Sequence, residues 1–394
     1  MNNWKEVEFS TEELGHYNRH LTIPEFGIEG QKKLKAARVL AIGAGGLGAP
    51  MLQYLAAAGV GTIGIVDFDK VEASNLHRQV LFGTSDIGCS KVQVTKERLH
   101  EINPHINIQV HEVRLTSDNA LDIIRNYDVV ADGTDNFPTR YLVNDACVML
   151  GKPNVHGSIF QFEGQVSVFN HLDEEGNRGP NYRDLFPEPP PPGLVPSCAE
   201  AGVLGVLPGI IGCLQASEVI KVITGIGTPL AGQLFLFDAQ DFTTRKVKVT
   251  ANEDNPLTGR DPEITELIDY EAFCGIPSSS NGVEKGDSEV PQVTVQEYKS
   301  WLENNDDVQL VDVREPHEVE IAEIGGELIP LKTIGDNVDK ISRDKKVVVH
   351  CRSGQRSADA VKRLQEEYGF DNLYNLKGGI LAWSQEIDES VPQY

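Results

Sequence analysis

Apolar runs alternate with helical segments through the first part of the chain. Strand-like runs occupy residues 38–43, 62–68 and 127–134, and apolar residues at helical spacing occupy 50–59 and 91–103. Strands that alternate with helices are typical of a doubly wound parallel sheet. The pattern therefore predicts an α/β fold for this region.

The pattern changes after residue 150. Residues 163–170 and 232–240 resemble further strands, which we expect to be antiparallel and to make the sheet mixed. Residues 207–225 form an apolar helical pattern that ends at a glycine. Between these segments, residues 181–198 are rich in proline, so we expect no regular structure there.

A low-hydrophobicity segment separates two regions of regular pattern. Residues 276–292 are rich in Ser, Gly and Glu, a composition typical of a flexible linker. Strand and helix patterns then start again and continue to the last residue. We therefore predict a first domain over 1–275, a linker over 276–292 and a smaller α/β domain over 293–394.

Charge and composition exclude several classes of partner. The chain has 394 residues and a formal net charge of −24, which disfavours nucleic acid and anionic membranes as bulk partners. No apolar run reaches about 18 residues, and the first ten residues have no apolar signal core, so we expect no membrane span and a cytoplasmic protein. The six cysteines are scattered without a CxxC pair, which predicts neither a disulfide framework nor a four-cysteine zinc site.

A glycine-rich turn follows the first predicted strand. The sequence "IGAGGLGAP" puts four glycines, at 43, 45, 46 and 48, between that strand and a helix predicted from Ala49. Such a turn lets the backbone approach phosphate oxygens at a helix N-terminus. Asp67 follows about 20 residues later at a strand end, where a carboxylate binds ribose hydroxyls. This signal alone fits NAD, another nucleotide, or a turn without a nucleotide.

Three cations and a carboxylate favour a triphosphate. Arg78 lies beyond the second strand, Lys91 begins the next helix, and Arg19 lies near the N-terminus. These charges suit ATP and the negative charge that develops when it is attacked. Asp135 offers a carboxylate for Mg²⁺. A lone Arg or Lys is usually a solvated surface residue, so the combination carries the prediction.

Longer motifs resemble a known family. The stretches "RHLTIPEFGIEGQKKL", "VDFDKVEASNLHRQVLF", "GCSKV" and "TDNFPTRYLVNDAC" closely resemble the ThiF/MoeB/HesA adenylyltransferases that activate ubiquitin-like sulfur carriers. The resemblance covers residues 17–275. It implies a Rossmann-like ubiquitin-activating-enzyme fold with a mixed sheet, ATP with magnesium rather than NAD, and a carrier protein with a C-terminal diglycine as partner. It also implies a homodimer, because Arg19 should reach the triphosphate of the other subunit. His16 stands where the family often has arginine.

The same resemblance implies a set of site residues. Arg78 and Lys91 are expected to assist catalysis, and Asp135 to hold magnesium. The residues expected to line the nucleotide are Arg19, Gly43, Gly45, Gly46, Gly48, Asp67, Asp69, Ser74, Asn75, Leu76, His77, Arg78, Lys91, Asp135 and Asn136.

Two further features of the first domain bear on the chemistry. Cys198 follows the proline-rich stretch and precedes an apolar helix, and it matches the thiol that bonds the activated carrier in the family. Family members also commonly carry two CxxC pairs that bind zinc. Here the corresponding positions are Asn181, Asp184, Asn255 and Thr258, a poor donor set for zinc. We therefore expect no structural zinc, and a hydrogen-bond network in its place.

The second domain carries its own cysteine motif. "VVVHCRSGQRS" places Cys351 between an apolar strand and a helix, where the helix N-terminus, Arg352 and Arg356 favour a thiolate or persulfide anion. A cysteine phosphatase has five residues between Cys and Arg, whereas four lie here. With "LVDVRE" and "LKGGILAW", residues 293–394 resemble a rhodanese domain. Asp312 and Arg314 are expected to be structural partners.

The whole chain resembles fused adenylyltransferase–rhodanese proteins of molybdopterin biosynthesis and sulfur-carrier thiocarboxylation. The resemblance implies adenylation of a carrier's C-terminal glycine, followed by sulfur transfer from a Cys351 persulfide to give a thiocarboxylate. The sulfur donor would be thiosulfate or a cysteine desulfurase. The alternatives are a stand-alone thiosulfate sulfurtransferase with a carrier-binding scaffold domain, and a nicotinamide oxidoreductase. The sequence does not distinguish molybdopterin, thiamine, cysteine and tRNA-thiolation carriers.

Overall fold

The computed structural model describes residues 3–173, 175–191, 202–275 and 290–394. The chain divides into two compact units, residues 1–279 and 280–394. Each unit has its own β-sheet and its own buried hydrophobic clusters. The two sheets therefore position two separate candidate sites.

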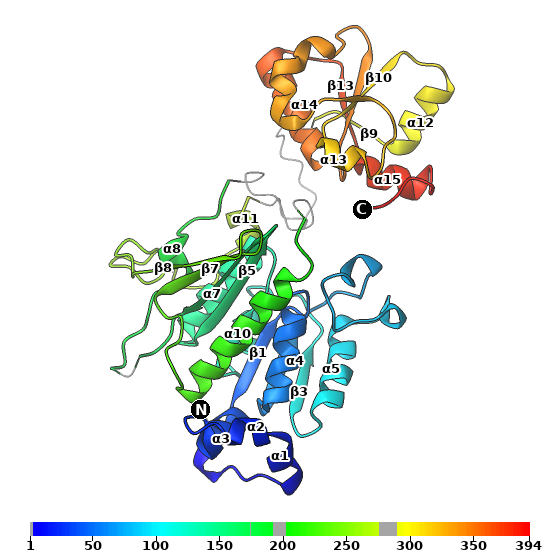
Figure 1. Cartoon of the computed structure of the whole chain (residues 1–394). Coiled ribbons are helices and arrows are strands. Elements are labelled where there is room, and N and C mark those ends of the chain that lie inside the picture. Colours follow the sequence, from blue (N-terminus) through cyan, green and yellow to red (C-terminus); the bar gives the residue numbers. More distant parts are fainter. Residues whose placement is uncertain (1–2, 174, 192–201, 276–289) are drawn as a thin grey trace. The chain divides into compact units, whose positions relative to one another are not determined.

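The first unit is built on one eight-stranded sheet in the order β3-β2-β1-β4-β5-β6-β7-β8 (Figure 1). The strands are β1 (Arg38–Ile42), β2 (Thr62–Val66), β3 (Asn107–His111), β4 (Val129–Asp132), β5 (Asn154–Phe160), β6 (Glu163–Phe169), β7 (Gln233–Asp238) and β8 (Thr243–Lys248). Neighbours from β3 to β5 are parallel, and neighbours from β5 to β8 are antiparallel. The mixed sheet predicted from the sequence is confirmed.

Helices cover both faces of this sheet. The helices of the unit are α1 (Thr11–His16), α2 (Asn18–Leu21), α3 (Gly27–Ala36), α4 (Gly48–Ala58), α5 (Lys91–Ile102), α6 (Ala120–Ile124), α7 (Phe137–Met149), α8 (Tyr182–Leu185), α10 (Leu207–Thr224) and α11 (Tyr270–Phe273). In β1, Val39 and Ala41 join the cluster that includes α4, α5 and α10, whereas Leu40 and Ile42 join the cluster that includes α6 and α7. Because alternate residues of a strand point to opposite faces, an apolar run such as β1 serves both clusters.

Helix α10 is long and apolar enough, by length and hydropathy, to cross a membrane, so the expectation that no such run exists was too strict. It nevertheless packs against α4, β5 and β6. The buried Gln215 amide donates to the carbonyl oxygens of Asp132 and Val155 at 2.7 and 3.1 Å. The apolar side of α10 therefore packs within the core of the first unit, and the Gln215 hydrogen bonds attach the helix to β4 and β5.

Helix α8 lies at the start of the stretch 181–198, for which the sequence predicts no regular structure. That prediction was wrong for Tyr182–Leu185. Asn181 caps the helix through its Oδ1, which accepts from the Arg183 amide at 2.9 Å, and the prolines begin only at residue 187. The fully buried Arg183 guanidinium also forms two hydrogen bonds to Asp145 of α7, at 2.8 and 2.7 Å. A buried ion pair holds only when both groups are satisfied, and the Tyr270 hydroxyl completes this one by donating to Asp145.

The second unit contains a five-stranded parallel sheet in the order β11-β10-β12-β13-β9 (Figure 1). Its elements are β9 (Gln292–Val293), α12 (Val295–Glu303), β10 (Val308–Asp312), α13 (Pro316–Val319), β11 (Glu327–Leu328), the 3₁₀ segment Leu331–Lys340, β12 (Lys346–His350), α14 (Gln355–Tyr368), β13 (Leu373–Leu376) and α15 (Gly379–Glu386). Gln292 pairs with Asn375, so the last residue of the predicted linker belongs to this sheet.

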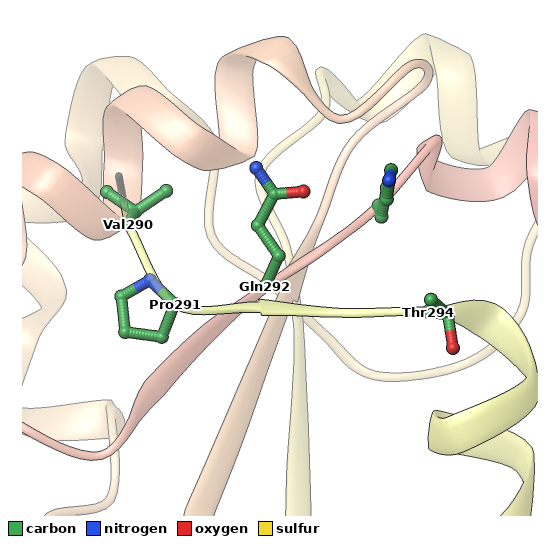
Figure 2. A pocket seen from close by; sticks show the side chains of 5 residues that line it. Val290, Pro291, Gln292 and Thr294 are labelled. Carbon is green, nitrogen blue, oxygen red and sulfur yellow. The ribbon is translucent and has the colours of Figure 1, made fainter. Parts of the chain in front are cut away.

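A hollow of about 440 Å³ lies beside β9 (Figure 2). It is lined by Val290, Pro291, Gln292, Thr294 and Lys377. None of these five residues belongs to the site predicted from the sequence.

Candidate functional site

The glycine turn lies at the carboxyl end of β1. Gly43 has a φ of +93°, and its amide donates to the carbonyl oxygen of Val66 at 2.8 Å. A Cβ atom on Gly48 would lie 2.1 Å from the carbonyl oxygen of Gly43. Only glycine therefore lets α4 begin this close to the end of β1, one residue before the predicted start at Ala49.

Asp67 ties the turn to the neighbouring strand. One carboxylate oxygen accepts from the Ala44 amide and the other from the Asp69 amide, each at 2.9 Å. Burial raises the pKa of Asp67, although these hydrogen bonds and Lys91 oppose the shift. The carboxylate predicted to bind ribose is thus held directly beside the turn.

Two other segments meet the turn. A Cβ atom on Gly46 would lie 3.1 Å from Pro208, at the start of α10, and 3.7 Å from Cγ of Arg78. A Cβ atom on Gly45 would lie 3.6 Å from Nε2 of Gln79. The structure therefore brings the glycine turn, the segment 74–79 and the start of α10 to one place.

Segment 74–79 is held by its own short hydrogen bonds. Asn75 is buried, and its main-chain oxygen accepts from the amides of Arg78 and Gln79 at 3.0 and 2.9 Å. The Ser74 hydroxyl lies 3.4 Å from the side-chain Nδ2 atom of Asn75, and Leu76 packs against the core. The loop before α10 approaches the segment so closely that a Cβ atom on Gly205 would lie 2.6 Å from the His77 carbonyl oxygen.

The two predicted catalytic cations have different surroundings. Arg78 is half-buried, and its Nη1 atom donates to the Ser74 carbonyl at 3.0 Å and lies 3.0 Å from His77 Nε2. Lys91 is buried at the first position of α5, with its Nζ atom 2.9 Å from a carboxylate oxygen of Asp69. Lys91 therefore already has an anionic partner, whereas the hydrogen bonds described for Arg78 go to a carbonyl oxygen and an imidazole.

Asp135 and Asn136 follow β4, next to β1 in the sheet. Both are exposed; Asn136 caps α7 by accepting from the Thr139 amide at 3.0 Å, and its Nδ2 lies 3.4 Å from Asp135 Oδ1. Mg²⁺ is commonly bound by one or two carboxylates together with substrate phosphates. An exposed carboxylate at this strand end fits such an ion when a nucleotide supplies the remaining ligands.

Arg19 does not join this group within one chain. It is exposed on α2, and the neighbouring Tyr17 accepts a hydrogen bond from Asn103 and lies beside Gly59, at the far end of α4 (Figure 1). The glycine turn lies at the opposite end of α4. Of the predicted nucleotide residues that the structure describes, Arg19 is the one placed away from the turn.

The four positions that correspond to zinc ligands in the family contact one another directly. The Asn181 amide donates to the Thr258 hydroxyl at 3.0 Å, and the Asn255 amide donates to Asp184 at 2.7 Å. Oδ2 of Asp184 also accepts from the Asn181 backbone amide, and Oδ1 of Asn255 accepts from the Thr258 backbone amide at 3.2 Å. The donor set is one carboxylate, two carboxamides and a hydroxyl, which is not the Cys/His set of structural zinc. These residues do not fit the metal, and hydrogen bonds connect the two loops instead.

The second unit holds Cys351 at the carboxyl end of its central strand. Cys351 is fully buried between β12 and α14. Its sulfur accepts a hydrogen bond from the Gly354 amide at 3.1 Å and lies 3.4 Å from the Ser357 hydroxyl. The loop therefore curves around the sulfur, as the spacing of the motif predicts.

The arginines of this loop pair with groups other than the sulfur. Arg356 forms two hydrogen bonds with Glu318, at 2.7 and 2.6 Å, and the ion pair raises the pKa of Arg356. Burial alone would raise the pKa of Glu318, but the bonds from Arg356 and from the Glu315 amide hold it below its usual value. Arg352 donates through Nε to the main-chain oxygen of Tyr394.

Asp312 and Arg314 form a buried pair at the carboxyl end of β10, where Asp312 lies opposite His350, the residue before Cys351. The Arg314 guanidinium donates to both carboxylate oxygens of Asp312, with distances from 2.5 to 3.0 Å. Nearby, burial lowers the pKa of His350 to about 4, so this imidazole is neutral at pH 7. The pair has the contacts of the structural partnership predicted from the sequence.

Sequence reasoning missed three residues and placed one where the structure gives no description. Gln79 ends the "SNLHRQ" motif and lies beside the turn, where only 4% of its surface is exposed. Glu318 and Tyr394 reach the Cys351 loop from distant segments without a recognisable motif. Cys198 lies outside the described residues.

Comparison with known proteins matches both units. The ThiF family model matches residues 17–258, and the Rhodanese-like domain model matches residues 294–386. The chain is 49% identical over 389 residues to a Mycobacterium tuberculosis protein named "Probable adenylyltransferase/sulfurtransferase MoeZ", and the match covers 98% of this chain and 96% of that protein. It is 57% identical over 270 residues to a Thermus thermophilus protein named "Sulfur carrier protein adenylyltransferase", covering 68% of this chain and 100% of that protein.

The fold also has solved counterparts. The crystal structure of Escherichia coli MccB matches with a TM-score of 0.56 at 23% identity, covering 65% of this chain and 75% of that chain. At this identity the likeness concerns the fold alone. It agrees with the Rossmann-like mixed sheet of the first unit.

The contact between Gly48 and Gly43 predicts which glycine of the turn is indispensable to the fold. G48A should lower the melting temperature of the first unit by at least about 5 °C, because its Cβ would overlap a main-chain oxygen. G45A is the matched control, since its Cβ would make only an ordinary contact with Gln79. Differential scanning calorimetry of the two variants measures this, and equal melting temperatures would contradict the assigned geometry.

Proposed function

This chain belongs to the ThiF family and carries a rhodanese-like domain behind its ThiF part, and on that premise we propose that it adenylates a sulfur carrier and then delivers sulfur to it. The proposed substrate is the C-terminal glycine carboxylate of a ubiquitin-like protein. The proposed product is a carrier thiocarboxylate, for molybdopterin or a related sulfur-containing cofactor. The names of the Mycobacterium and Thermus relatives support both activities.

One observation carries the adenylation half of the proposal. The glycine turn, Asp67, the segment 74–79 and the start of α10 converge at the carboxyl end of β1. A carboxylate is a poor electrophile, and transfer of AMP from ATP gives it a good leaving group. In this scheme the turn amides bind phosphate, Asp67 binds ribose, and Arg78 and Lys91 stabilise the charge that develops during transfer. Asp135 would hold Mg²⁺, which neutralises phosphate charge when bound.

The pairing of Lys91 with Asp69 adds a step to this scheme. Lys91 Nζ is 2.9 Å from Asp69, whose side chain is 51% exposed. A triphosphate carries more negative charge than this carboxylate, so we expect Lys91 to exchange Asp69 for a phosphate oxygen when ATP binds. Asp69 would then rotate toward solvent without leaving a buried charge unpaired.

Sulfur transfer is proposed to begin at Cys351. The terminal sulfur of its persulfide attacks the adenylated carbonyl, AMP leaves, and the carrier is joined to Cys351 through an acyl disulfide. A second thiolate, for which we propose Cys198, attacks the Cys351 sulfur. The carrier thiocarboxylate leaves with the electron pair, and a Cys198–Cys351 disulfide forms. Two equivalents of an external thiol then reduce that disulfide, are oxidised to a disulfide themselves, and restore both cysteines.

Arg19 supports a homodimer in this scheme. Because α2 lies at the opposite end of α4 from the turn, an Arg19 side chain that contacts a triphosphate would have to come from a second copy of the chain. We also propose a cytoplasmic location, with thiosulfate or a cysteine desulfurase as sulfur donor. The alternative is a stand-alone thiosulfate sulfurtransferase with a carrier-binding scaffold domain, which would show no carrier-dependent ATP–pyrophosphate exchange.

We further propose that the protein folds without structural zinc. The bonds between Asn181 and Thr258 and between Asn255 and Asp184 join the two loops that the CxxC pairs would join. A third bond, from the Asn252 amide to Asp184 at 2.8 Å, extends the connection along the second loop.

Loss of either cation should nearly abolish the first half-reaction. R78A and K91A should each slow carrier-dependent ATP–pyrophosphate exchange by about 100-fold or more, because each removes one charge from the expected triphosphate site. R125A is the control, since Arg125 pairs only with Asp122 among its described ion pairs and lies on the surface after α6. Exchange at the wild-type rate in R78A or K91A would refute the nucleotide assignment.

The two cysteines should separate the two half-reactions. C351A should keep ATP–pyrophosphate exchange but lose thiosulfate sulfurtransferase activity and thiocarboxylate formation, because it lies in the other unit. C198A should keep exchange and sulfurtransferase activity and slow only thiocarboxylate release. Mass spectrometry of the carrier measures this, and added sulfide should partly rescue C351A by attacking the adenylate. If C351A makes thiocarboxylate from thiosulfate at the wild-type rate, the second unit is not the donor.

Elemental analysis tests the absence of zinc. Protein purified without chelator should contain far less than one zinc per chain, and added EDTA should leave its melting temperature unchanged. D184A should lower the melting temperature of the first unit by several degrees, because it leaves the Asn252 amide and the Asn255 side chain without their acceptor. About one zinc per chain would show that the hydrogen-bonded arrangement is not the native one.

A further inference from the structure

The last described residue of the chain contacts the charged side chains around the Cys351 loop. The Tyr394 hydroxyl accepts from Arg314 at 2.6 Å and lies 3.3 Å from a Glu318 carboxylate oxygen, to which it can donate. Its main-chain oxygen accepts from Arg352. One residue thus contacts three of the charged groups that surround the loop.

The Tyr394 ring adds two more contacts. The guanidinium of Arg352 lies 5.5 Å from the ring centroid, and that of Arg314 lies 5.9 Å from it. Both distances are within the range of cation–π attraction. Burial raises the pKa of the phenol, so it stays protonated at pH 7 and can donate to Glu318.

The segment before Tyr394 is anchored independently. The Ser384 hydroxyl on α15 donates to the Val391 carbonyl at 2.6 Å, and the Val391 amide donates to the Asp388 carbonyl at 3.1 Å. These bonds turn the chain back after α15. Tyr394 therefore reaches the loop from a fixed point and not from a free end.

These contacts hold the side chains of both arginines near Cys351 in position. Arg356 is held by Glu318, and Glu318 faces the Tyr394 hydroxyl. Arg352 is held by the Tyr394 main-chain oxygen and ring. An anionic sulfur donor must approach a sulfur that is fully buried, and these two cations stand directly after Cys351 and in the first turn of α14.

We propose that Tyr394 is a positioning residue of the sulfur-transfer site, which holds Arg352 and the Glu318–Arg356 pair where they attract an anionic donor to Cys351. The proposal rests on the proposed function of the second unit and adds the residue that arranges its cations. Tyr394 touches neither the sulfur nor the donor in this role. It acts through the arginines.

The test compares an anionic and a neutral alkylating reagent at Cys351 in the full-length chain. The ratio of the iodoacetate rate to the iodoacetamide rate reports the positive charge that an incoming anion meets. Y394A should lower this ratio about tenfold, because the ring and hydroxyl contacts are lost. Y394F should lower it about threefold, because only the hydroxyl bonds are lost. The KM for thiosulfate should rise by similar factors, while kcat stays within about twofold.

Y374F is the matched control. Tyr374 lies on β13 of the same unit, and its ring packs against Trp301 at 5.3 Å. It should leave the ratio and the KM unchanged, and circular dichroism should show that all three variants are folded. A C351A chain shows which part of the labelling belongs to Cys351.

Two results would overturn the proposal. One is a ratio and a KM within twofold of wild type in both Tyr394 variants. The other is an equal acceleration of both reagents in Y394A, which would make Tyr394 a simple steric cover. If wild-type protein has no thiosulfate activity, the proposed function of this unit fails, but the alkylation ratio still decides the role of Tyr394.

Discussion

The close approach of α4 to the end of β1 is the constraint on which the first site depends. No side chain fits at residue 48, because its Cβ would meet the Gly43 carbonyl oxygen at 2.1 Å. The resulting turn places Gly46 against Pro208 and Arg78, and it presents the Ala44 amide to Asp67. A wider turn would separate these groups, and the glycine turn would no longer lie against the segment that carries Arg78.

The elements around this turn are fixed by buried polar bonds as well as by apolar packing. Gln215 ties α10 to β4 and β5, and the Arg183–Asp145 pair ties α8 to α7. These groups are fully buried, so each must be satisfied within the protein. Asn181, Asp184, Asn255 and Thr258 link two loops by hydrogen bonds, and of these four residues Asn181 and Asn255 are buried. Directional hydrogen bonds there connect the two loops at which the family resemblance implies zinc ligands.

The second site uses charge differently. In the first unit Arg78 is half-buried and contacts the Ser74 carbonyl and the His77 ring, whereas Arg356 has a carboxylate partner. The Cys351 sulfur, on which we propose that a persulfide forms, is fully buried, and the Gly354 amide and the Ser357 hydroxyl face it. In this proposal the arginines provide a positive approach to the loop. That arrangement depends on Glu318 of α13 and on Tyr394, which both lie far from the Cys351 motif in the sequence.

The sequence by itself determined the alternation of strands and helices, the glycine turn and the Cys351 loop, because each is specified by residues close together in the chain. It also predicted the mixed sheet, although strands such as β6 and β7 pair across distant parts of the chain. It also indicated that Asn181, Asn255 and Thr258 are poor zinc ligands. It did not predict α8, because the proline content of 181–198 concealed a single capped turn. Only the tertiary structure paired Lys91 with Asp69, Arg356 with Glu318 and Asn255 with Asp184. These partners are 22, 38 and 71 positions apart, and pairing at such separations follows from the packing of whole elements, which no local pattern encodes.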